Sequence, residues 1–357
     1  MADVEAVIVA GGLGSRLLPL TTHTPKHLLP VAGVPLVVHQ IAKLAAAGVE
    51  HVVLATSYQA EQFAPVLGDG DAWGLRLTYI TEDEPLGTGG AIRNASGHLD
   101  SAPEDPVVIL NGDILSGHDL AGQLKHHVDA AADVTLHLVE VADARAYGCV
   151  PTDEDGHVLA FVEKSPDPVS NQINAGCYLF ARRVIDDIPA GRVVSVERET
   201  FPRLLTYGRS VQGYVDRSYW IDVGTPASLV RASVDLVRGL AHSPAYEEPP
   251  ATAWIDPGAV IAPDAVVAGG SAVGTDAWIG SHAVVDGSVL CAGARVEEGA
   301  RIVDSIVGPD ASVGRGTTLE SAVVGDRAVV GDRCELMAGL RVACDAELTQ
   351  AAVRFSP

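Results

Sequence analysis

The sequence lacks any long apolar run. Hydrophobic residues make up 47% of its 357 residues, yet they are broken up throughout by polar residues and glycine. A membrane-spanning helix needs about 20 consecutive apolar residues, so we expect no span and no membrane partner. The N-terminal segment MADVEAVIVAGG has no basic residues before its short apolar run, which argues against a secretory signal. The expected location is therefore cytoplasmic.

Positive charge and cysteine are also scarce. The chain has 24 Lys and Arg residues against 46 Asp and Glu residues, a net charge of −22. Nucleic-acid binders need a basic face, so we expect no nucleic-acid partner, and any phosphate site must be locally basic. The 5 cysteines form no CxxC pair, which indicates reduced thiols and gives no support to a zinc site.

What is present, first of all, is a glycine-rich loop. The apolar run at residues 4–9 is typical of a buried parallel strand and leads into the loop at residues 10–33. Glycines lack a Cβ and so allow backbone N–H groups to approach an anion, while Arg16 and Lys26 add positive charge. Leu17 occupies the position of a third dinucleotide-type glycine, and no Gly-Lys-Ser/Thr follows. The loop therefore matches neither common phosphate motif.

Strand and helix patterns then alternate. Residues 35–48 show the apolar spacing of an amphipathic helix, and the β-prone runs at 51–55 and 75–80 flank a helical segment at 58–67. A later short helix is expected at 91–96. This alternation predicts a doubly wound, mostly parallel α/β domain. In such a sheet ligands bind at the carboxyl ends of the strands, where the glycine loop begins.

Several further motifs lie in the same part of the chain. An aspartate after the β-prone run 107–110 suits Mg²⁺ beside phosphates, because that ion prefers hard oxygen ligands. Asparagine and glutamate side chains offer donors and acceptors in fixed positions. Ser195-Val196-Glu197-Arg198 opens an expected helix, and its role does not follow from the sequence. The other motifs are Glu84-Pro85-Leu86-Gly87-Thr88, Asn111-Gly112-Asp113, Tyr147-Gly148-Cys149-Val150, Phe161-Val162-Glu163-Lys164, Asn174-Ala175-Gly176 and Trp220-Ile221-Asp222-Val223-Gly224-Thr225-Pro226.

The last part of the chain has a different period. Apolar residues recur at every sixth position, and the phase slips by one residue at Leu290, Val307 and Val324. The hexapeptide period predicts a left-handed parallel β-helix of about five to six coils. Solenoid ends and faces often mediate association, so we expect a homo-oligomer. We place the α/β domain at residues 1–241, a linker at 242–252 and the β-helix at 253–357. The apolar column comprises Ile255, Ile261, Val267, Val273, Ile279, Val285, Leu290, Val296, Ile302, Val307, Val313, Leu319, Val324, Val330, Leu336, Val342 and Leu348.

The glycine-rich loop, GGLGSRLLPLTTHTPKHLLPV, resembles the signature GGxGxRLxPLTxxxPKxLLPV of sugar-nucleotide pyrophosphorylases. The Glu84–Thr88 motif resembles the form in mannose-1-phosphate guanylyltransferases, whereas thymidylyl- and uridylyltransferases usually carry other versions. The resemblance covers nearly the whole chain, repeats included. It implies an enzyme that joins a sugar-1-phosphate, with mannose-1-phosphate as the first choice, to GTP in the presence of Mg²⁺ and releases pyrophosphate.

The resemblance also implies roles for individual residues. Arg16 would contact the leaving pyrophosphate and Lys26 the phosphates in the transition state, while Asp113 and Asp222 would hold Mg²⁺. The attacking phosphate oxygen is already anionic, so no general base is needed. The implied nucleotide-binding residues are Gly11, Gly12, Gly14, Ser15, Glu84, Pro85, Gly87, Thr88, Asn111 and Gly112. The implied sugar-phosphate-binding residues are Gly148, Glu163, Lys164, Asn174 and Gly176.

Three alternatives stay open. His27 and Ser165 stand where the family usually has proline, so another nucleoside triphosphate, glucose-1-phosphate or a cyclitol phosphate is an alternative substrate. A non-catalytic regulatory subunit of the same fold would have lost signature residues such as Arg16 and Lys26, which this chain retains. A hexapeptide acyltransferase would use a histidine base near a coil corner, and His282 is the one histidine in the repeats.

Overall fold

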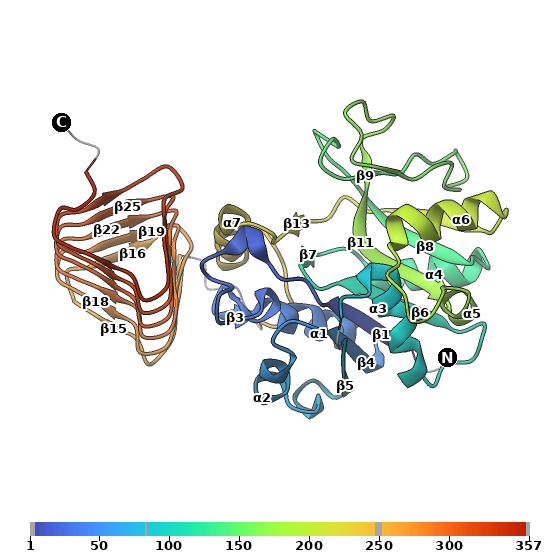
Figure 1. Ribbon diagram of the computed structural model, residues 1–357, viewed down its shortest axis with the longest axis horizontal. Helices are drawn as coiled ribbons and strands as arrows, with labels where there is room; N and C mark the ends of the chain where they lie inside the picture. The colour runs from blue at the N-terminus through green and yellow to red at the C-terminus, as the bar shows by residue number, and fades with distance from the viewer. Residues whose placement is uncertain (1–3, 83, 247–251, 355–357) are drawn as a thin grey trace. The chain divides into compact units, whose positions relative to one another are not determined.

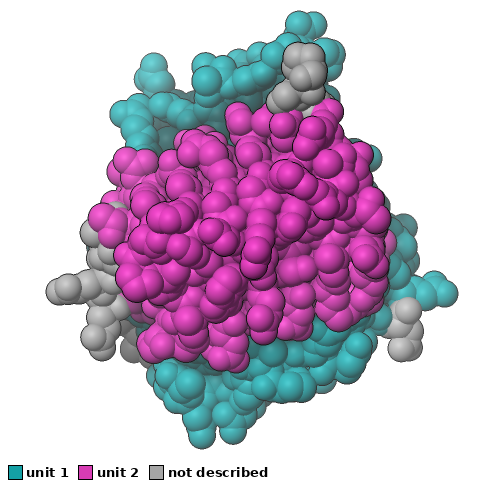
Figure 2. Space-filling view, turned by 90° about the vertical axis from the view of Figure 1, so that its left-hand side faces the viewer, with its two compact units in different colours: residues 1–12, 40–220 teal, residues 13–39, 221–357 magenta. Residues whose placement is uncertain are grey.

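The computed structural model describes residues 4–82, 84–246 and 252–354, and Figure 1 traces the elements they form. Contacts within the chain divide it into two compact units (Figure 2). Unit 1 comprises residues 1–12 and 40–220, and unit 2 comprises residues 13–39 and 221–357. Residues 247–251 of the predicted linker lie outside the described residues.

A nine-stranded sheet forms the centre of unit 1, in the order β10-β9-β11-β6-β1-β4-β5, with β8 beside β11 and β12 beside β8. β1 lies between β4 and β6 and is parallel to both, whereas β11 is antiparallel to β6. The predicted doubly wound, mostly parallel α/β architecture is confirmed. The strands are β1 (Val4–Ala10), β4 (Val49–Thr56), β5 (Arg76–Thr81), β6 (Pro106–Asn111), β8 (Val134–Glu140), β9 (Gly148–Cys149), β10 (Val162–Glu163), β11 (Gln172–Ala181) and β12 (Val211–Val215).

The inner strands are almost continuously apolar because both faces of the sheet are covered. Val7 and Ile8 of β1 point to opposite faces, and both are fully buried. The covering helices are α1 (Leu36–Ala46), α2 (Phe63–Leu67), α3 (Gly87–Ala95), α4 (Leu120–Asp129), α5 (Arg182–Asp186) and α6 (Phe201–Thr206), the last preceded by a π-helical turn at Val196–Thr200. None of the helices in the described ranges has the length and apolar composition that a membrane span requires.

Helix α3 begins earlier than the sequence predicts. The expected helix starts at residue 91, whereas α3 starts at Gly87. The N–H groups of Gly89 and Gly90 donate to the Val194 carbonyl at 2.8 and 3.3 Å. A Cβ at Gly90 would lie 2.7 Å from the Leu86 Cβ. Glycine lowers helix propensity by about 1 kcal/mol, so the local pattern hides this turn and a tertiary contact forms it.

Another predicted element is shorter than expected. Of the helical segment predicted at 58–67, a 3₁₀ turn at Ala60–Gln62 and helix α2 form.

Unit 2 contains a parallel β-helix of three sheets, which confirms the fold predicted from the hexapeptide period (Figure 1). The first sheet consists of β14 (Ala253–Ile255), β17 (Ser271–Val273), β20 (Val289–Leu290), β23 (Ile306–Val307), β26 (Val323–Val324) and β29 (Arg341–Val342). The second consists of β15 (Val260–Ile261), β18 (Trp278–Ile279), β21 (Arg295–Val296), β24 (Ser312–Val313), β27 (Val329–Val330) and β30 (Glu347–Leu348). The third consists of β16 (Val266–Ala268), β19 (Val284–Asp286), β22 (Arg301–Val303), β25 (Thr318–Glu320) and β28 (Glu335–Leu336).

Each phase slip in the sequence corresponds to a coil of the β-helix that is one residue shorter than a coil without a slip. Val273 pairs with Leu290, and Leu290 pairs with Val307. Val324 pairs with Val342, so the coil that begins at Val324 is one residue longer than the coils that begin at Val273 and Leu290. The apolar column from Val273 to Val342 is buried inside the β-helix. Ile255, at the start of the column, is 43% exposed, because it lies on the first coil.

The rest of unit 2 surrounds the end of the glycine-rich loop. A small hairpin of β2 (Pro30–Val31) and β3 (Val34–Pro35) packs against helix α7 (Pro226–Val237), and the Ala32 N–H donates to Ser233 Oγ at 3.0 Å. Thr225 and Ser228 form a capping box at the start of α7, which satisfies two N–H groups of its first turn. Strand β13 (Trp220–Asp222) ends at Asp222. In unit 1, the short strand β7 (Ile114–Ser116) follows Asp113.

The β-helix core gives the first prediction. Ile302 is fully buried in the apolar column, so we expect Ile302→Ala to lower the free energy of unfolding of the β-helix by about 2–5 kcal/mol through lost contacts and a cavity. Arg301→Ala, on the exposed side of the same strand, should change it by less than about 0.5 kcal/mol. Urea unfolding followed by circular dichroism measures the free energy of unfolding of both variants. An equal loss in the two variants would contradict the burial of Ile302 in the apolar column.

Candidate functional site

The predicted site residues lie in both units, so each group is described within its own unit. In unit 1, β1 and β6 pair in register, with Val9 opposite Asn111. The Gly112 N–H donates to the Val9 carbonyl at 2.9 Å. Gly11 and Gly12 follow β1, and Gly112 and Asp113 follow β6, so these four residues leave the sheet at the same edge. Ser57 Oγ, after β4, donates to the Gly11 carbonyl at 2.6 Å.

The loop that leads into α3 is held by a segment far along the chain. Thr88 Oγ1 donates to Glu197 Oε2 at 2.9 Å and accepts from the Val196 N–H at 2.9 Å. Ser195 Oγ also donates to Glu197 Oε2. Gly87 is exposed at the start of α3, as are Glu84 and Pro85 before it. The motif Ser195–Arg198, which the sequence left without a role, therefore fixes the predicted nucleotide-binding loop.

Glu82 is a second residue whose importance the sequence did not reveal. Its side chain is buried, and Oε2 accepts from the Leu86 N–H at 3.1 Å. The other oxygen, Oε1, is buried and has no hydrogen-bond partner among the described residues. A Cβ added to Gly11 would lie 3.9 Å from Glu82 Oε2. Burial raises the pKa of this carboxyl group above its ordinary value. Glu82 thus presents an unused acceptor beside the glycine loop and the start of α3.

The predicted sugar-side residues of unit 1 fall into two groups. Asn174 Nδ2 donates to the Tyr178 hydroxyl at 2.8 Å, and Asn174 Oδ1 accepts from the Gly176 N–H at 3.1 Å. Asn111 Nδ2 lies 3.4 Å from the same hydroxyl, so Tyr178 joins Asn111 to Asn174. Tyr178 is fully buried, and burial raises the pKa of its phenol well above the ordinary value. The hydroxyl therefore stays protonated and holds both amides.

The second group lies on the short strands β9 and β10. Gly148 pairs with Glu163 in antiparallel register, and the Lys164 N–H donates to the Tyr147 carbonyl at 3.0 Å. Lys164 Nζ lies 3.6 Å from Glu163 Oε1, and the lysine side chain is 61% exposed. An exposed ion pair of this kind contributes at most about 1 kcal/mol. The Lys164 ammonium can therefore turn toward an anionic ligand at little cost.

In unit 2 the glycine-rich loop contains a sharp turn at Gly14. Its φ of +64° is favourable for glycine and strained for other residues. A Cβ there would lie 2.9 Å from Thr21 Cγ2 and 3.0 Å from Lys26 Cβ. Thr21 Oγ1 donates to the Gly14 carbonyl at 3.0 Å. The turn therefore brings Lys26, which is half-buried, next to the start of the loop.

The same unit brings Arg16 to Asp222. Arg16 Nη2 lies 3.9 Å from Asp222 Oδ2, with the arginine side chain 66% exposed and the aspartate 28% exposed. At this distance and exposure the pair is weak, so Arg16 remains available to a phosphate. Ser15 is exposed beside Arg16. The unit thus assembles Gly14, Ser15, Arg16, Lys26 and Asp222, although Asp222 is 206 positions from Arg16 in the sequence.

Asp113 and Asp222 have the chemistry that a magnesium ion requires. Both are half-buried carboxylates, and Mg²⁺ binds through one or two carboxylates plus phosphate oxygens and water. Neither belongs to the clusters of three or more possible metal ligands found in the described ranges, which are His23–Asp326–Cys344 and Glu5–His51–Asp100. Asp113 lies in unit 1 and Asp222 in unit 2, and each carboxylate by itself offers the hard oxygen ligand that this ion takes together with phosphate oxygens and water.

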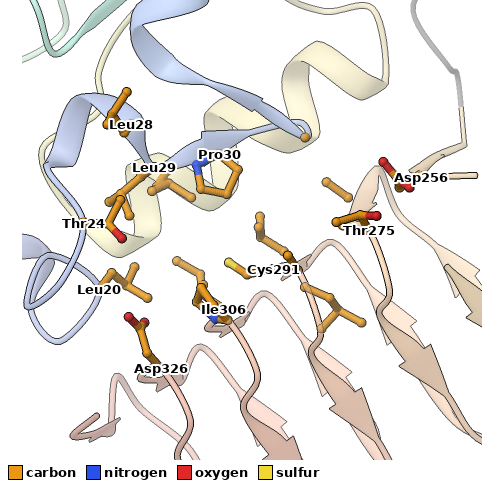
Figure 3. Close-up of a pocket in the computed structure, with 18 of the residues that line it drawn as sticks. Leu20, Thr24, Leu28, Leu29, Pro30, Asp256, Thr275, Cys291, Ile306 and Asp326 are labelled. Carbon is orange, nitrogen blue, oxygen red and sulfur yellow. The ribbon is translucent and has the colours of Figure 1, made fainter. Parts of the chain in front are cut away.

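A cavity of about 290 Å³ in unit 2 is a different kind of site (Figure 3). It is lined mainly by apolar side chains of the glycine-rich loop and the β-helix, such as Leu20, Leu29 and Ile306, together with Asp326. None of the predicted site residues lines it. Apolar walls with the carboxylates of Asp256 and Asp326 do not suit a triphosphate, so we do not assign substrate binding to this cavity.

A family model described as nucleotidyl transferase matches residues 5–239. The chain belongs to the nucleotidyl transferase family. A second model, described as the GMPPB C-terminal domain, matches residues 250–353. The predicted family is thereby confirmed, and the second match covers the β-helix.

This chain is also similar to individual proteins with known names or solved structures. "Mannose-1-phosphate guanylyltransferase" from Mycobacterium tuberculosis is 53% identical over 261 residues, which are 73% of this chain and 72% of that protein. "Mannose-1-phosphate guanylyltransferase catalytic subunit beta" from Drosophila pseudoobscura is 37% identical over 62% of this chain and 59% of its own length. The crystal structure of HddC from Yersinia pseudotuberculosis complexed with GMP-PN has a TM-score of 0.54 at 30% identity, over 64% of this chain and 97% of that chain.

The contact between Thr88 and Glu197 gives the second prediction. Thr88→Val removes the hydroxyl that bridges Glu197 and the Val196 N–H, and Glu197→Gln weakens the acceptor. We expect the two substitutions to couple by about 0.5–3 kcal/mol in a double-mutant cycle on unfolding free energy, because they remove the same contact. Thr88→Val combined with Glu199→Gln is the matched control, since Glu199 bonds Ser195 and Arg192 instead. Coupling of equal size in both cycles would contradict the assignment.

Proposed function

We propose that this protein is a mannose-1-phosphate guanylyltransferase, which joins mannose-1-phosphate to GTP and releases pyrophosphate. The observation that carries the proposal is the 53% identity, over 73% of the chain, to the Mycobacterium tuberculosis protein of that name. The retained signature residues Arg16, Lys26, Asp113 and Asp222 support an active enzyme over a regulatory subunit. The family matches also support the proposed domain limits of 1–241 and 253–357.

The proposed reaction is an in-line displacement at the α-phosphorus of GTP. An oxygen of the sugar phosphate attacks, the bond to the pyrophosphate oxygen breaks, and pyrophosphate leaves with the electron pair. The attacking oxygen is already anionic at neutral pH, so the protein supplies position and charge in place of a base. We assign Arg16 to the leaving pyrophosphate and Lys26 to the phosphates in the transition state.

We further propose that Asp113 and Asp222 hold Mg²⁺ during the reaction. The bound ion would neutralise charge on the phosphate oxygens. Gly11, Gly12, Gly14, Ser15, Asn111 and Gly112 would bind the nucleotide phosphates and ribose through backbone and side-chain donors. The long contact of the exposed Arg16 guanidinium with Asp222 supports the role of Arg16, because the guanidinium can exchange this contact for a phosphate at little cost.

On the sugar side, we assign Lys164 to the substrate phosphate and Glu163 and Asn174 to the sugar hydroxyls. Gly148 and Gly176 would let the backbone approach the sugar. Two observations support this part of the proposal: the exposed Lys164 ammonium is paired only weakly, and Asn174 is held in one orientation by Tyr178 and Gly176. An amide with a fixed orientation can distinguish between hydroxyl arrangements.

On the base side, we propose that Glu82 accepts hydrogen bonds from guanine, next to the loop Glu84, Pro85, Gly87 and Thr88. Guanine carries an N1–H and a 2-amino group side by side, whereas adenine has its amino group at C6 and no donor at N1 or C2. A buried carboxylate oxygen without a partner in the described part of the chain suits such a donor, because an unmade buried hydrogen bond is costly. The acceptor therefore favours GTP over ATP.

We also propose a cytoplasmic homo-oligomer. Free cysteines, several of them buried, suit a reducing compartment. Val260 and Val266 on the first coil of the β-helix are 58% and 51% exposed, which suits association through that domain. Sedimentation of the purified protein as a monomer would contradict the oligomer, and recovery from a cell envelope fraction would contradict the location.

The proposed function is tested by pyrophosphate release with Mg²⁺ for GTP, UTP, dTTP, ATP and CTP, each with mannose-1-phosphate and glucose-1-phosphate. We expect the highest kcat/KM with GTP and mannose-1-phosphate. A different preferred pair would overturn the specificity and keep the reaction class. Absence of turnover with every pair, despite GTP binding, would favour the regulatory alternative.

The role of Glu82 gives a further prediction. We expect Glu82→Gln to lower kcat/KM for GTP roughly 10- to 100-fold, because a charge-assisted hydrogen bond is worth about 1.5–3 kcal/mol. The kcat/KM for ATP should change much less. Glu61→Gln, at an exposed position, is the control for general effects.

Glu82 also predicts a pH dependence of base selection. Burial raises the pKa of its carboxyl group, and only the ionised form offers two acceptors. The preference for GTP over ATP should therefore decline as the pH falls through this raised pKa, and Glu82→Gln should abolish the pH dependence. Steady-state rates between mildly acidic and neutral pH measure it, and an unchanged preference over that range would contradict the role.

A further inference from the structure

Two side chains of helix α1 reach the segment that contains Asp113. Gln40 Nε2 donates to the Asn111 carbonyl at 2.8 Å and to the Ile114 carbonyl at 2.8 Å. One turn further along, Lys43 Nζ donates to the Ser116 carbonyl at 2.9 Å. The two residues are three positions apart, so they lie on the same face of the helix. All of these contacts lie within unit 1.

The two acceptors of Gln40 stand on either side of Asp113. Strand β6 ends at Asn111 and strand β7 begins at Ile114, so Gly112 and Asp113 form the connection between them. The sheet fixes the Gly112 N–H through the Val9 carbonyl. Gln40 fixes the last carbonyl before the connection and the first one after it. A single amide group therefore sets the spacing of the backbone that carries the Asp113 carboxylate.

The contact is enclosed. Gln40 is 5% exposed, so water cannot easily replace its two donated hydrogen bonds. Both hydrogens of the amide are used, which fixes the orientation of the group. A leucine or methionine would fill the same volume without holding the two carbonyls. The glutamine thus has a function in this place that apolar packing does not supply.

We propose that Gln40 is a positioning residue for nucleotidyl transfer: it holds the backbone on both sides of Asp113 and so places this carboxylate for the magnesium ion. The inference rests on the proposed function, in which Asp113 is a metal ligand. Groups that orient a metal ligand typically change metal affinity 10- to 100-fold when they are removed. Gln40 touches neither the ion nor the substrates in this scheme, and it acts through Asp113.

The test compares Gln40→Met with Gln123→Met. Gln123 is a fully buried glutamine of the same unit, and its hydrogen bonds go to Thr135, His118 and Cys177, not to the backbone carbonyls on either side of Asp113. Both variants lose buried amide contacts, so both are expected to lower stability. Only Gln40→Met should change the metal site.

We expect Gln40→Met to raise the Mg²⁺ concentration for half-maximal turnover about tenfold, with the KM for mannose-1-phosphate unchanged. Hydrogen–deuterium exchange of peptides covering residues 111–116 should become faster. The concentration of Mn²⁺ that half-saturates the GTP-bound protein, measured by electron paramagnetic resonance, should rise by a similar factor. Gln123→Met should leave both metal dependences as in the unmodified chain.

An unchanged metal dependence in Gln40→Met, or an equal change in Gln123→Met, would overturn the role of Gln40. If the unmodified chain shows no turnover with any substrate pair, the proposed function fails, and the Mn²⁺ measurement then decides about Gln40 separately. Weaker Mn²⁺ binding in Gln40→Met alone would still support the positioning role. Equal Mn²⁺ binding in the two variants would overturn it.

Discussion

The parallel pairing of β1 with β6 is the constraint on which the candidate site of unit 1 depends. With Val9 opposite Asn111, the chain leaves both strands at the same level, and Gly112 bonds back to β1. Gly11, Gly12 and Asp113, all in unit 1, can then meet one ligand. A shift of the register by one residue would move every side chain of a strand to the other face, and the buried runs on both faces prevent that shift. The apolar core of the sheet therefore fixes the spacing of polar groups at its edge.

Loops at such an edge have few backbone partners, and in this protein distant side chains supply them. Glu197 holds Thr88, Tyr178 joins Asn111 to Asn174, and Gln40 holds both sides of Asp113. In each case a buried or half-buried polar side chain forms hydrogen bonds with polar groups of the loop. Unmade buried hydrogen bonds cost about 1–3 kcal/mol each, so these contacts restrict the loops to one arrangement before a substrate arrives. A reaction without a general base relies on the positions of the reacting groups, so it requires loops that are held in one arrangement.

Electrostatics imposes a second constraint. The chain carries a net charge of −22, yet its proposed substrates are polyanions. Arg16 and Lys26 are brought together within one loop by the turn at Gly14, and Lys164 stands on the strand pair of the sugar side. The ion pairs of Arg16 with Asp222 and of Lys164 with Glu163 are long, and both cationic side chains are exposed, so these acids compete only weakly with a phosphate. Local cationic groups therefore outweigh the acidic background where phosphates are expected.

Some properties of this protein follow from the sequence alone. The β-helix is determined locally, because each coil repeats the same apolar position and each phase slip shortens one coil. The α/β domain and the family follow from alternating patterns and from loop motifs whose residues are close together. Tertiary structure alone reveals the start of α3 at Gly87 and the contributions of Glu82, Glu197, Tyr178 and Gln40. Their partners lie on other strands and helices, up to 109 positions away, and a single glutamine, tyrosine or glutamate forms no periodic pattern. Only the folded sheet, which brings distant strand ends to one edge, decides which of these polar groups meet.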